Sequence, residues 1–286
     1  MNTVSVNENP FGRKLVLACL LPILLVNIVA FMVPVLNLAA MSFRAASSTG
    51  SLEEGITVST WLGLFGDGYY WSMVGRTVWF GILITIITLL LSYPLALFVS
   101  RREGSLKAFL VVVCISPLLI SAVVRTYGWM VILGDQGVLP SLIRASGFTP
   151  PRLINNETGV IIGMVEILMP YMILSLLSGF GKLDATLEQA AGTLGARPFT
   201  VFRRVVLPLS LPGILLGCLL CFVLAVSSFI TPKMLAGGRV SLLATEIYDQ
   251  AIVTLNWPLA ACLSVLILVV FGAALVLYGR LSKIVE

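Results

Sequence analysis

The chain has 286 residues, of which 58% are hydrophobic and 11% are charged, with a formal net charge of +5. Soluble globular domains contain roughly 45–50% apolar residues, so a mean hydropathy of +1.04 excludes a single water-soluble core. There is no histidine and the five cysteines are an odd number, which argues against a disulfide framework and a Cys/His metal site. We interpret the mid-span C-x-x-C at 218–221 as two small packing side chains. The composition predicts an integral membrane protein.

Six apolar runs predict six membrane-spanning helices. Each approaches the ~20 residues that a helix needs to cross a bilayer and is too long and unbroken for a barrel strand. The first run exceeds the ~7–15-residue core of a secretory signal, so we interpret it as a retained helix. The runs cover residues 15–41, 74–99, 108–133, 159–178, 209–230 and 258–278 of one membrane domain, 1–286.

The basic residues of the connecting segments predict that both termini are cytoplasmic. With the N-terminus inside, eleven of the 18 basic residues fall in cytoplasmic segments, whereas acidic and basic residues balance outside. An excess of Lys and Arg marks the cytoplasmic side. The inside bases are Arg13, Lys14, Arg101, Arg102, Lys107, Lys182, Arg197, Arg203, Arg204, Arg280 and Lys283.

Aromatic residues gather where the first outside segment meets the second span. Side chains at this depth usually form an aromatic belt at the headgroups, and a cage for a cationic solute is the alternative. These residues are Trp61, Phe65, Tyr69, Tyr70 and Trp71.

Two ionisable residues, Arg125 and Glu166, lie inside predicted spans, where burial of a charge is costly and marks a candidate functional site. At ~1.5 Å per residue both lie about 12–14 Å below the outer edge, so antiparallel neighbours would place them at one depth. Either they form a structural ion pair, or Glu166 faces a translocation path and helps a cation to pass. Trp129 and Tyr171 would offer aromatic faces to that cation.

The fifth run carries two further features. Ser227, Ser228 and Thr231 would line the same path, although hydroxyls in spanning helices more often bond to their own backbone. Gly213 and Gly217 permit close helix approach, which we interpret as packing at a subunit interface.

The polar stretch "EQAAGTLGARPFTVFRRVVLP", residues 188–208, interrupts the apolar runs. Thr186 with Gln189 fits a capping box, and Asp184 is a rival N-cap. Gly195 suits the left-handed end of a short helix, and Pro198 fits the first turn of a second. These signals predict a helix–turn–helix elbow on the cytoplasmic surface. Its small apolar stripe fits a partner's groove or a headgroup layer and consists of Leu187, Ala190, Ala191 and Leu194.

This stretch resembles the EAA loop of ABC importer permeases, whose consensus is EAA, three residues, Gly, nine residues and I-x-L-P. Here it reads Gln189-Ala190-Ala191, then Gly195, then "VVLP" at 205–208, with matching spacing. Gln189 replaces the motif glutamate, Glu188 stands one residue earlier, and a valine replaces the isoleucine. The segments "SYPLALFVSRR", "ISPLLISAVVRTYGWMVILGDQG", "GVIIGMVEILMPYMILSLLSGFGKLD" and "NWPLAACLSVLIL" resemble the spermidine/putrescine-type branch, especially its first permease subunit.

The resemblance implies an all-α, MetI-like type I permease with a coupling loop, 179–208, in a bacterial inner membrane. It implies a heterodimer with a second homologous permease, two ATP-binding subunits that hold ATP and Mg²⁺, an extracytoplasmic solute-binding protein and a polyamine-like solute. It implies no nucleic acid and no cofactor in this chain. The ATPase-coupling residues would be Leu187, Glu188, Gln189, Ala190, Ala191, Gly192, Leu194, Gly195 and Arg197.

The chain has no G-x-x-x-x-G-K-[ST] phosphate loop, so we expect a translocation subunit and not an enzyme. Three alternatives remain open. The same importer class would carry an amino-acid derivative, an opine or an oxyanion. A stand-alone secondary transporter or channel would show inverted repeats and broken helices, and a membrane-bound assembly protein would have no reason to place Glu166 in a span.

Overall fold

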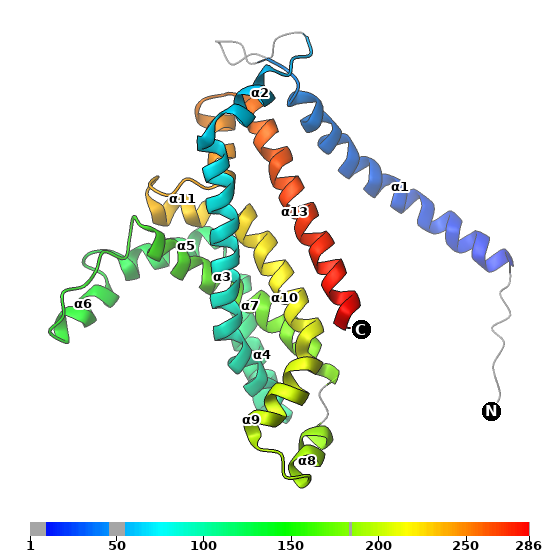
Figure 1. The fold of residues 1–286 in the computed structure, drawn as a ribbon, viewed down its shortest axis with the longest axis vertical. Coiled ribbons are helices and arrows are strands. Elements are labelled where there is room, and N and C mark those ends of the chain that lie inside the picture. Colours follow the sequence, from blue (N-terminus) through cyan, green and yellow to red (C-terminus); the bar gives the residue numbers. More distant parts are fainter. Residues whose placement is uncertain (1–9, 46–54, 183–184, 286) are drawn as a thin grey trace.

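The computed structural model describes residues 10–45, 55–182 and 185–285, and within these ranges all regular secondary structure is helical. Five of the described helices are long and apolar enough to cross a membrane, and a bent pair makes a sixth candidate. The predicted all-α membrane fold is therefore confirmed. The long helices are α1 (Pro10–Met41), α3 (Gly68–Ser100), α7 (Glu157–Gly179), α10 (Leu207–Ser227) and α13 (Trp257–Val285) (Figure 1).

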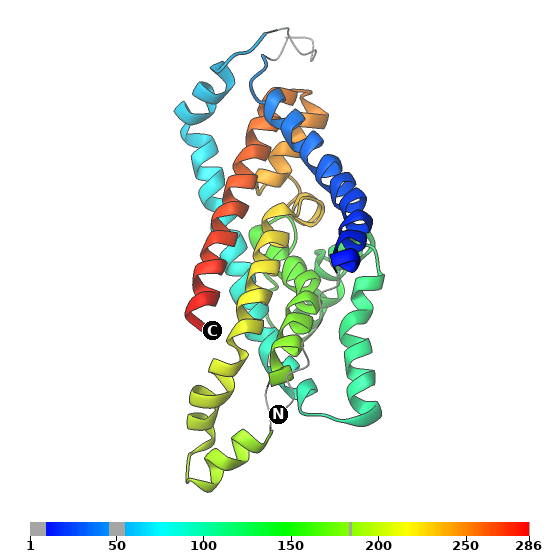
Figure 2. The ribbon, with the colours of Figure 1, turned by 90° about the vertical axis from the view of Figure 1, so that its right-hand side faces the viewer.

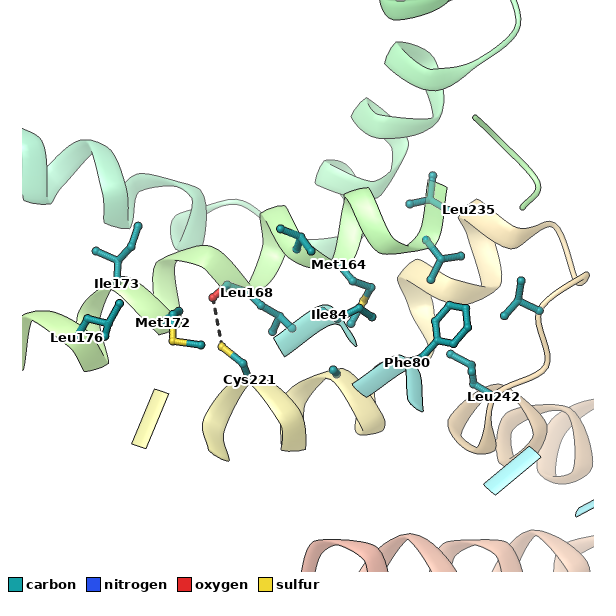
Figure 3. Close-up of a cluster of buried hydrophobic side chains, with 14 of the residues drawn as sticks. Phe80, Ile84, Met164, Leu168, Met172, Ile173, Leu176, Cys221, Leu235 and Leu242 are labelled. Carbon is teal, nitrogen blue, oxygen red and sulfur yellow. Dashed lines mark hydrogen bonds between the residues drawn. The ribbon is translucent and has the colours of Figure 1, made fainter. Parts of the chain in front are cut away.

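The centre of the bundle is α7, which packs against α3 and α10. Its fully buried residues recur every four positions, as one face of an α-helix requires, and they are Val160, Met164, Leu168, Met172 and Leu176. Phe80 and Ile84 of α3 belong to the same cluster, and the Cys221 thiol of α10 donates to the Leu168 carbonyl oxygen at 3.7 Å (Figure 3). Cys221 is thus a packing residue.

Glycines let α7 and α10 approach until their backbones touch. A Cβ on Gly179 would lie 2.6 Å from the Gly213 Cα, and a Cβ on Gly213 would lie 2.9 Å from the Ser175 carbonyl oxygen. A Cβ on Gly217 would lie 2.6 Å from the Met172 sulfur. The Gly213–Gly217 pair therefore packs within the chain. Its interpretation as a subunit-interface motif is wrong, because small residues allow close approach wherever two helices cross.

The third predicted span, 108–133, is broken. α4 (Gly104–Ile115) passes into a short 3-10 turn, η1 (Ser116–Leu119), and α5 (Ala122–Leu133) follows. The helical stretches before and after the break are bent by 96°. The helix predicted over 108–133 is therefore interrupted, and its two parts make one candidate span only when they are taken together.

Proline chemistry accounts for this break. Pro117 has no N–H to donate to the carbonyl of Val113, four residues earlier. The Ser116 hydroxyl donates to that oxygen instead, at 2.9 Å, and Ile120 has an extended backbone, with ψ of 134°. Apolar composition predicts membrane depth for this segment, but it carries little information about such a bend.

The fifth predicted span, 209–230, is displaced toward the N-terminus. The chain is helical without interruption from Pro198 to Ser227, because α9 (Pro198–Val201) continues through a π-helical turn, η3 (Phe202–Val206), into α10. At Ser228 the backbone becomes extended. The remaining short elements are α2 (Ser59–Gly66), α6 (Val138–Ala145), the 3-10 turn η2 (Phe180–Lys182), α8 (Ala185–Thr193), α11 (Ile230–Ala236), α12 (Leu243–Tyr248), and the π-helical turn η4 (Asp249–Val253).

Helix α1 leaves the bundle. It contacts α13, and both views show the rest of α1 diverging from the other long helices (Figures 1 and 2). Nearly all its described side chains are exposed, among them Leu21, Phe31 and Leu36. An apolar helix without cover in its own chain needs lipid or another subunit around it.

Replacing Gly179 or Gly213 by alanine should destabilise the bundle by about 1–3 kcal/mol, because backbone atoms cannot move aside as a side chain can. The melting temperature of the purified chain in detergent measures this loss. Gly272→Ala on α13 is the matched control, since a Cβ there meets nothing within 4 Å. Equal melting temperatures for all three variants would contradict the close-packing account.

Candidate functional site

Two groups of predicted site residues lie in different parts of the molecule. The first is the elbow, residues 185–206, at the end of the bundle where α8 (Ala185–Thr193) and α9 lie (Figure 1). The second is the Glu166 site, which consists of Arg125, Trp129 and Glu166.

The elbow has the predicted helix–turn–helix form. Gly195 follows α8 with φ of +79°, the left-handed conformation that glycine adopts without strain. The Ala196 N–H donates to the Ala191 carbonyl oxygen at 3.1 Å, and Pro198 begins α9 after Arg197, its N-cap. Proline fits there because the first helical turn has no use for its missing N–H.

One local prediction at the elbow is wrong. The described α8 begins at Ala185, so Thr186 lies inside the helix and is not its N-cap. The capping-box pattern with Gln189 is therefore not realised. Asp184, the rival N-cap, lies outside the described residues.

Apolar side chains of the elbow are exposed on this chain. The exposed fraction is 45% for Leu187, 88% for Leu194 and 73% for Phe199. Ala190 and Gly192 are exposed as well, and Ala191 is half-buried. The elbow thus presents an apolar surface that its own chain leaves open.

Glu188 and Gln189 of the elbow face different surroundings. Glu188 forms an ion pair with Arg101 at the end of α3, with Nη2 to Oε2 at 2.8 Å. Arg101 and Glu188 line a hollow of about 370 Å³ between α3 and the elbow. Gly192 and Phe202 line it as well. Gln189, at the motif glutamate position, is exposed. The one-residue displacement of the acid therefore turns its charge toward its own chain. The opposite charges of Arg101 and Glu188 are visible in the sequence, but their contact is not.

The Glu166 site joins α5 to α7. The Arg125 Nη1 lies 3.8 Å from the Glu166 Oε1, and the Trp129 indole N–H donates to Oε2 at 3.1 Å. The side chain of Arg125 is 10% exposed and that of Glu166 is 30% exposed. Arg125 of α5 and Glu166 of α7 thus lie close together, and Trp129 binds the carboxylate by its N–H.

The other predicted path residues are placed differently. Tyr171 is half-buried against the main core cluster, and five residues of helix turn it well away from the Glu166 face. The Ser227 hydroxyl donates to its own backbone at Leu224 (3.3 Å), and Ser228 is where α10 ends. Among the described residues, neither serine bonds to the Glu166 site.

A buried hydroxyl pair lies beside this site, and the sequence predicts only one of its members, Thr231, as a path residue. Thr126 of α5 and Thr231 of α11 lie 3.0 Å apart, and both are fully buried. Thr126 also donates to the Ala122 carbonyl oxygen at 2.8 Å. The pair fixes α5 against α11, since a buried hydroxyl without a partner would be costly.

The outer aromatic residues stack on one another. The ring centroids of Trp61 and Phe65 are 5.6 Å apart, and those of Phe65 and Trp71 are 5.9 Å apart. The Trp71 N–H donates to the Phe65 carbonyl oxygen at 3.2 Å. This arrangement agrees with an aromatic belt at the headgroups. The ring faces of Trp61, Phe65 and Trp71 are partly covered by one another. Within the described part of the chain, no cluster of acidic, Cys or His side chains has the grouping of a metal site.

Comparisons with known proteins show which family and which solved structures this chain resembles. Residues 92–283 match the model for binding-protein-dependent transport system inner membrane components. The spermidine/putrescine transport system permease protein PotB of Haemophilus influenzae is 33% identical over 89% of this chain and 90% of its own length. PotB of Escherichia coli K12 is 29% identical over 92% of this chain and 98% of its own length. A chain of a bacterial alginate ABC transporter has a TM-score of 0.79 and 16% identity, with 98% of each chain covered.

The chain belongs to the family of binding-protein-dependent transport system inner membrane components. It is a multi-pass membrane protein of the ABC permease type, and the predicted permease fold is confirmed. Its relatives are transport permease subunits, which agrees with a translocation subunit and favours it over a stand-alone secondary transporter.

Loss of the Arg101–Glu188 ion pair should loosen the elbow. Glu188→Gln should increase the rate of tryptic cleavage after the elbow arginines about two- to fivefold, since a half-exposed ion pair contributes up to ~1 kcal/mol. Limited digestion of the purified chain followed by mass spectrometry measures this rate. Glu103→Gln, in the exposed turn after α3, is the control. An unchanged cleavage rate in Glu188→Gln would mean that the pair does not hold the elbow.

Proposed function

We propose that this chain is the permease subunit of an ATP-driven importer that translocates a polyamine-like organic cation delivered by an extracytoplasmic binding protein. Its similarity to two PotB proteins over about nine tenths of the chain supports this substrate class. The observation that carries the proposal is Glu166, a partly exposed carboxylate in an apolar bundle. Both termini and the elbow would be cytoplasmic, as the distribution of basic residues predicts.

The Glu166 site suits an ammonium group. The Glu166 carboxylate supplies acceptors, and the Trp129 N–H fixes its orientation. In the low dielectric of the membrane a hydrogen bond to a charged group is strong. An acid with an open oxygen would therefore let a cation pass through a region that otherwise repels it.

The elbow would couple this chain to the motor. Its exposed apolar side chains would enter a groove of an ATP-binding subunit, and two such subunits would bind ATP and Mg²⁺. Closure of the two ATPases would move the elbow, and with it α7 and α10, from which it emerges. A second, homologous permease would complete the path as a heterodimer.

Glu166→Gln should lower spermidine uptake about 10- to 100-fold per assembled transporter, because a hydrogen bond to a charged group contributes about 1.5–3 kcal/mol. Uptake of radiolabelled spermidine into proteoliposomes with the complete importer measures this change. Glu157→Gln, in the first turn of the same helix, is the matched control. Normal uptake by Glu166→Gln would remove Glu166 from the path, and wild-type importer without spermidine uptake would exclude this substrate.

Leu194→Asp and Phe199→Asp should abolish co-purification of the cognate ATPase, because a charge in an apolar groove is costly to bury. The amount of this ATPase recovered with the affinity-tagged permease measures docking. Phe148→Asp is the matched control, since Phe148 is 72% exposed, as Phe199 is 73% exposed, but lies outside the elbow. Full ATPase recovery with both elbow variants would exclude the elbow as the docking element.

A further inference from the structure

The Glu166 site contains a cation of its own. The Arg125 side chain is nine-tenths buried, and its Nε and Nη1 atoms donate no hydrogen bond to any described residue. The 3.8 Å between Nη1 and the Glu166 Oε1 exceeds the ~2.7–3.2 Å of an N–H···O hydrogen bond. Buried donors without acceptors are unfavourable, so the guanidinium would gain a hydrogen bond by closing on the carboxylate.

Of the two oxygens of the Glu166 carboxylate, one accepts a hydrogen bond from the site. Oε2 accepts from the Trp129 N–H at 3.1 Å, whereas Oε1 is the oxygen that faces Arg125 without a hydrogen bond. Because the Glu166 side chain is 30% exposed, a second cation has access to it. One carboxylate oxygen is thus within reach of two positive charges.

We propose that Arg125 is a resident cation that competes with the transported ammonium group for Oε1 of Glu166 and so sets how quickly the solute leaves. This inference rests on the proposed contact between Glu166 and a cationic solute. With an ammonium on Oε1, two like charges are close together in a poorly hydrated site, which weakens solute binding. Return of the guanidinium to Oε1 satisfies its donors and displaces the amine.

This competition gives the site a property that transport requires. Binding along a path must be favourable enough for entry and weak enough for departure. A lone carboxylate at this depth would hold a polyamine strongly, whereas Arg125 limits that affinity. Arg125 therefore acts on the solute through Glu166, as a positioning residue.

The long Arg125 side chain allows the pair to change its separation. Its neighbour Thr126 is held to Thr231 of α11, so α5 keeps its place. Rotation about the side-chain bonds of Arg125 moves the guanidinium toward or away from Oε1 of Glu166. This movement breaks no helical hydrogen bond.

The test is equilibrium binding of radiolabelled spermidine to the assembled transporter in detergent, without its binding protein. Arg125→Gln should bind about tenfold more tightly and release spermidine more slowly, because the competing charge is gone. Arg125→Lys keeps a cation and should stay within about threefold of wild type. Arg76→Gln, an exposed arginine of α3, is the matched control and should bind as wild type does.

The outcomes separate this inference from the proposed function. If Glu166→Gln weakens binding while Arg125→Gln binds as wild type does or more weakly, the competition is overturned and the path role of Glu166 stands. If Glu166→Gln binds and transports normally, both fail. If Arg125→Gln does not assemble, the pair is structural and the competition is again overturned. The double variant Arg125→Gln/Glu166→Gln should bind as weakly as Glu166→Gln.

Discussion

The contact of α7 with α10 through glycine governs the rest of this structure. Gly179 is the last residue of α7, and Gly213 lies in the second turn of α10, so their contact joins the two points between which the elbow emerges. Any side chain larger than hydrogen would force these backbones apart. The elbow is therefore held at both of its ends, and a force on it reaches two central helices at once.

The same central helix, α7, also carries the ionisable residue Glu166. One face of α7 buries apolar side chains against α3 and α10, whereas Glu166 faces Arg125 and Trp129 of α5. The break before α5 is what brings that segment across α7 at this depth. A straight third span would preserve the depth of Arg125 but not the direction from which it approaches.

Several surfaces of the chain require other molecules. The exposed apolar side chains of α1 and of the elbow form surfaces that are too large to be left in water. For α1, lipid or a second permease is a sufficient environment. For the elbow, the proposed ATP-binding subunit would supply that cover. The permease is thus one part of an assembly, as its family name indicates.

Residue types and their spacing are sufficient to predict the class of protein, its long apolar helices, the elbow, and the two ionisable residues placed within predicted spans. Hydropathy indicates which segments enter the membrane, and Gly195 and Pro198 indicate local backbone geometry. The partner of each side chain follows from the folded structure. It assigned Gly213 and Gly217 to an intrachain contact, Glu188 to Arg101, and Trp129 to a donor role. It also shows the bend in the third span. These outcomes depend on how helices distant in sequence cross, and helical periodicity alone does not contain the crossing angle or the neighbour.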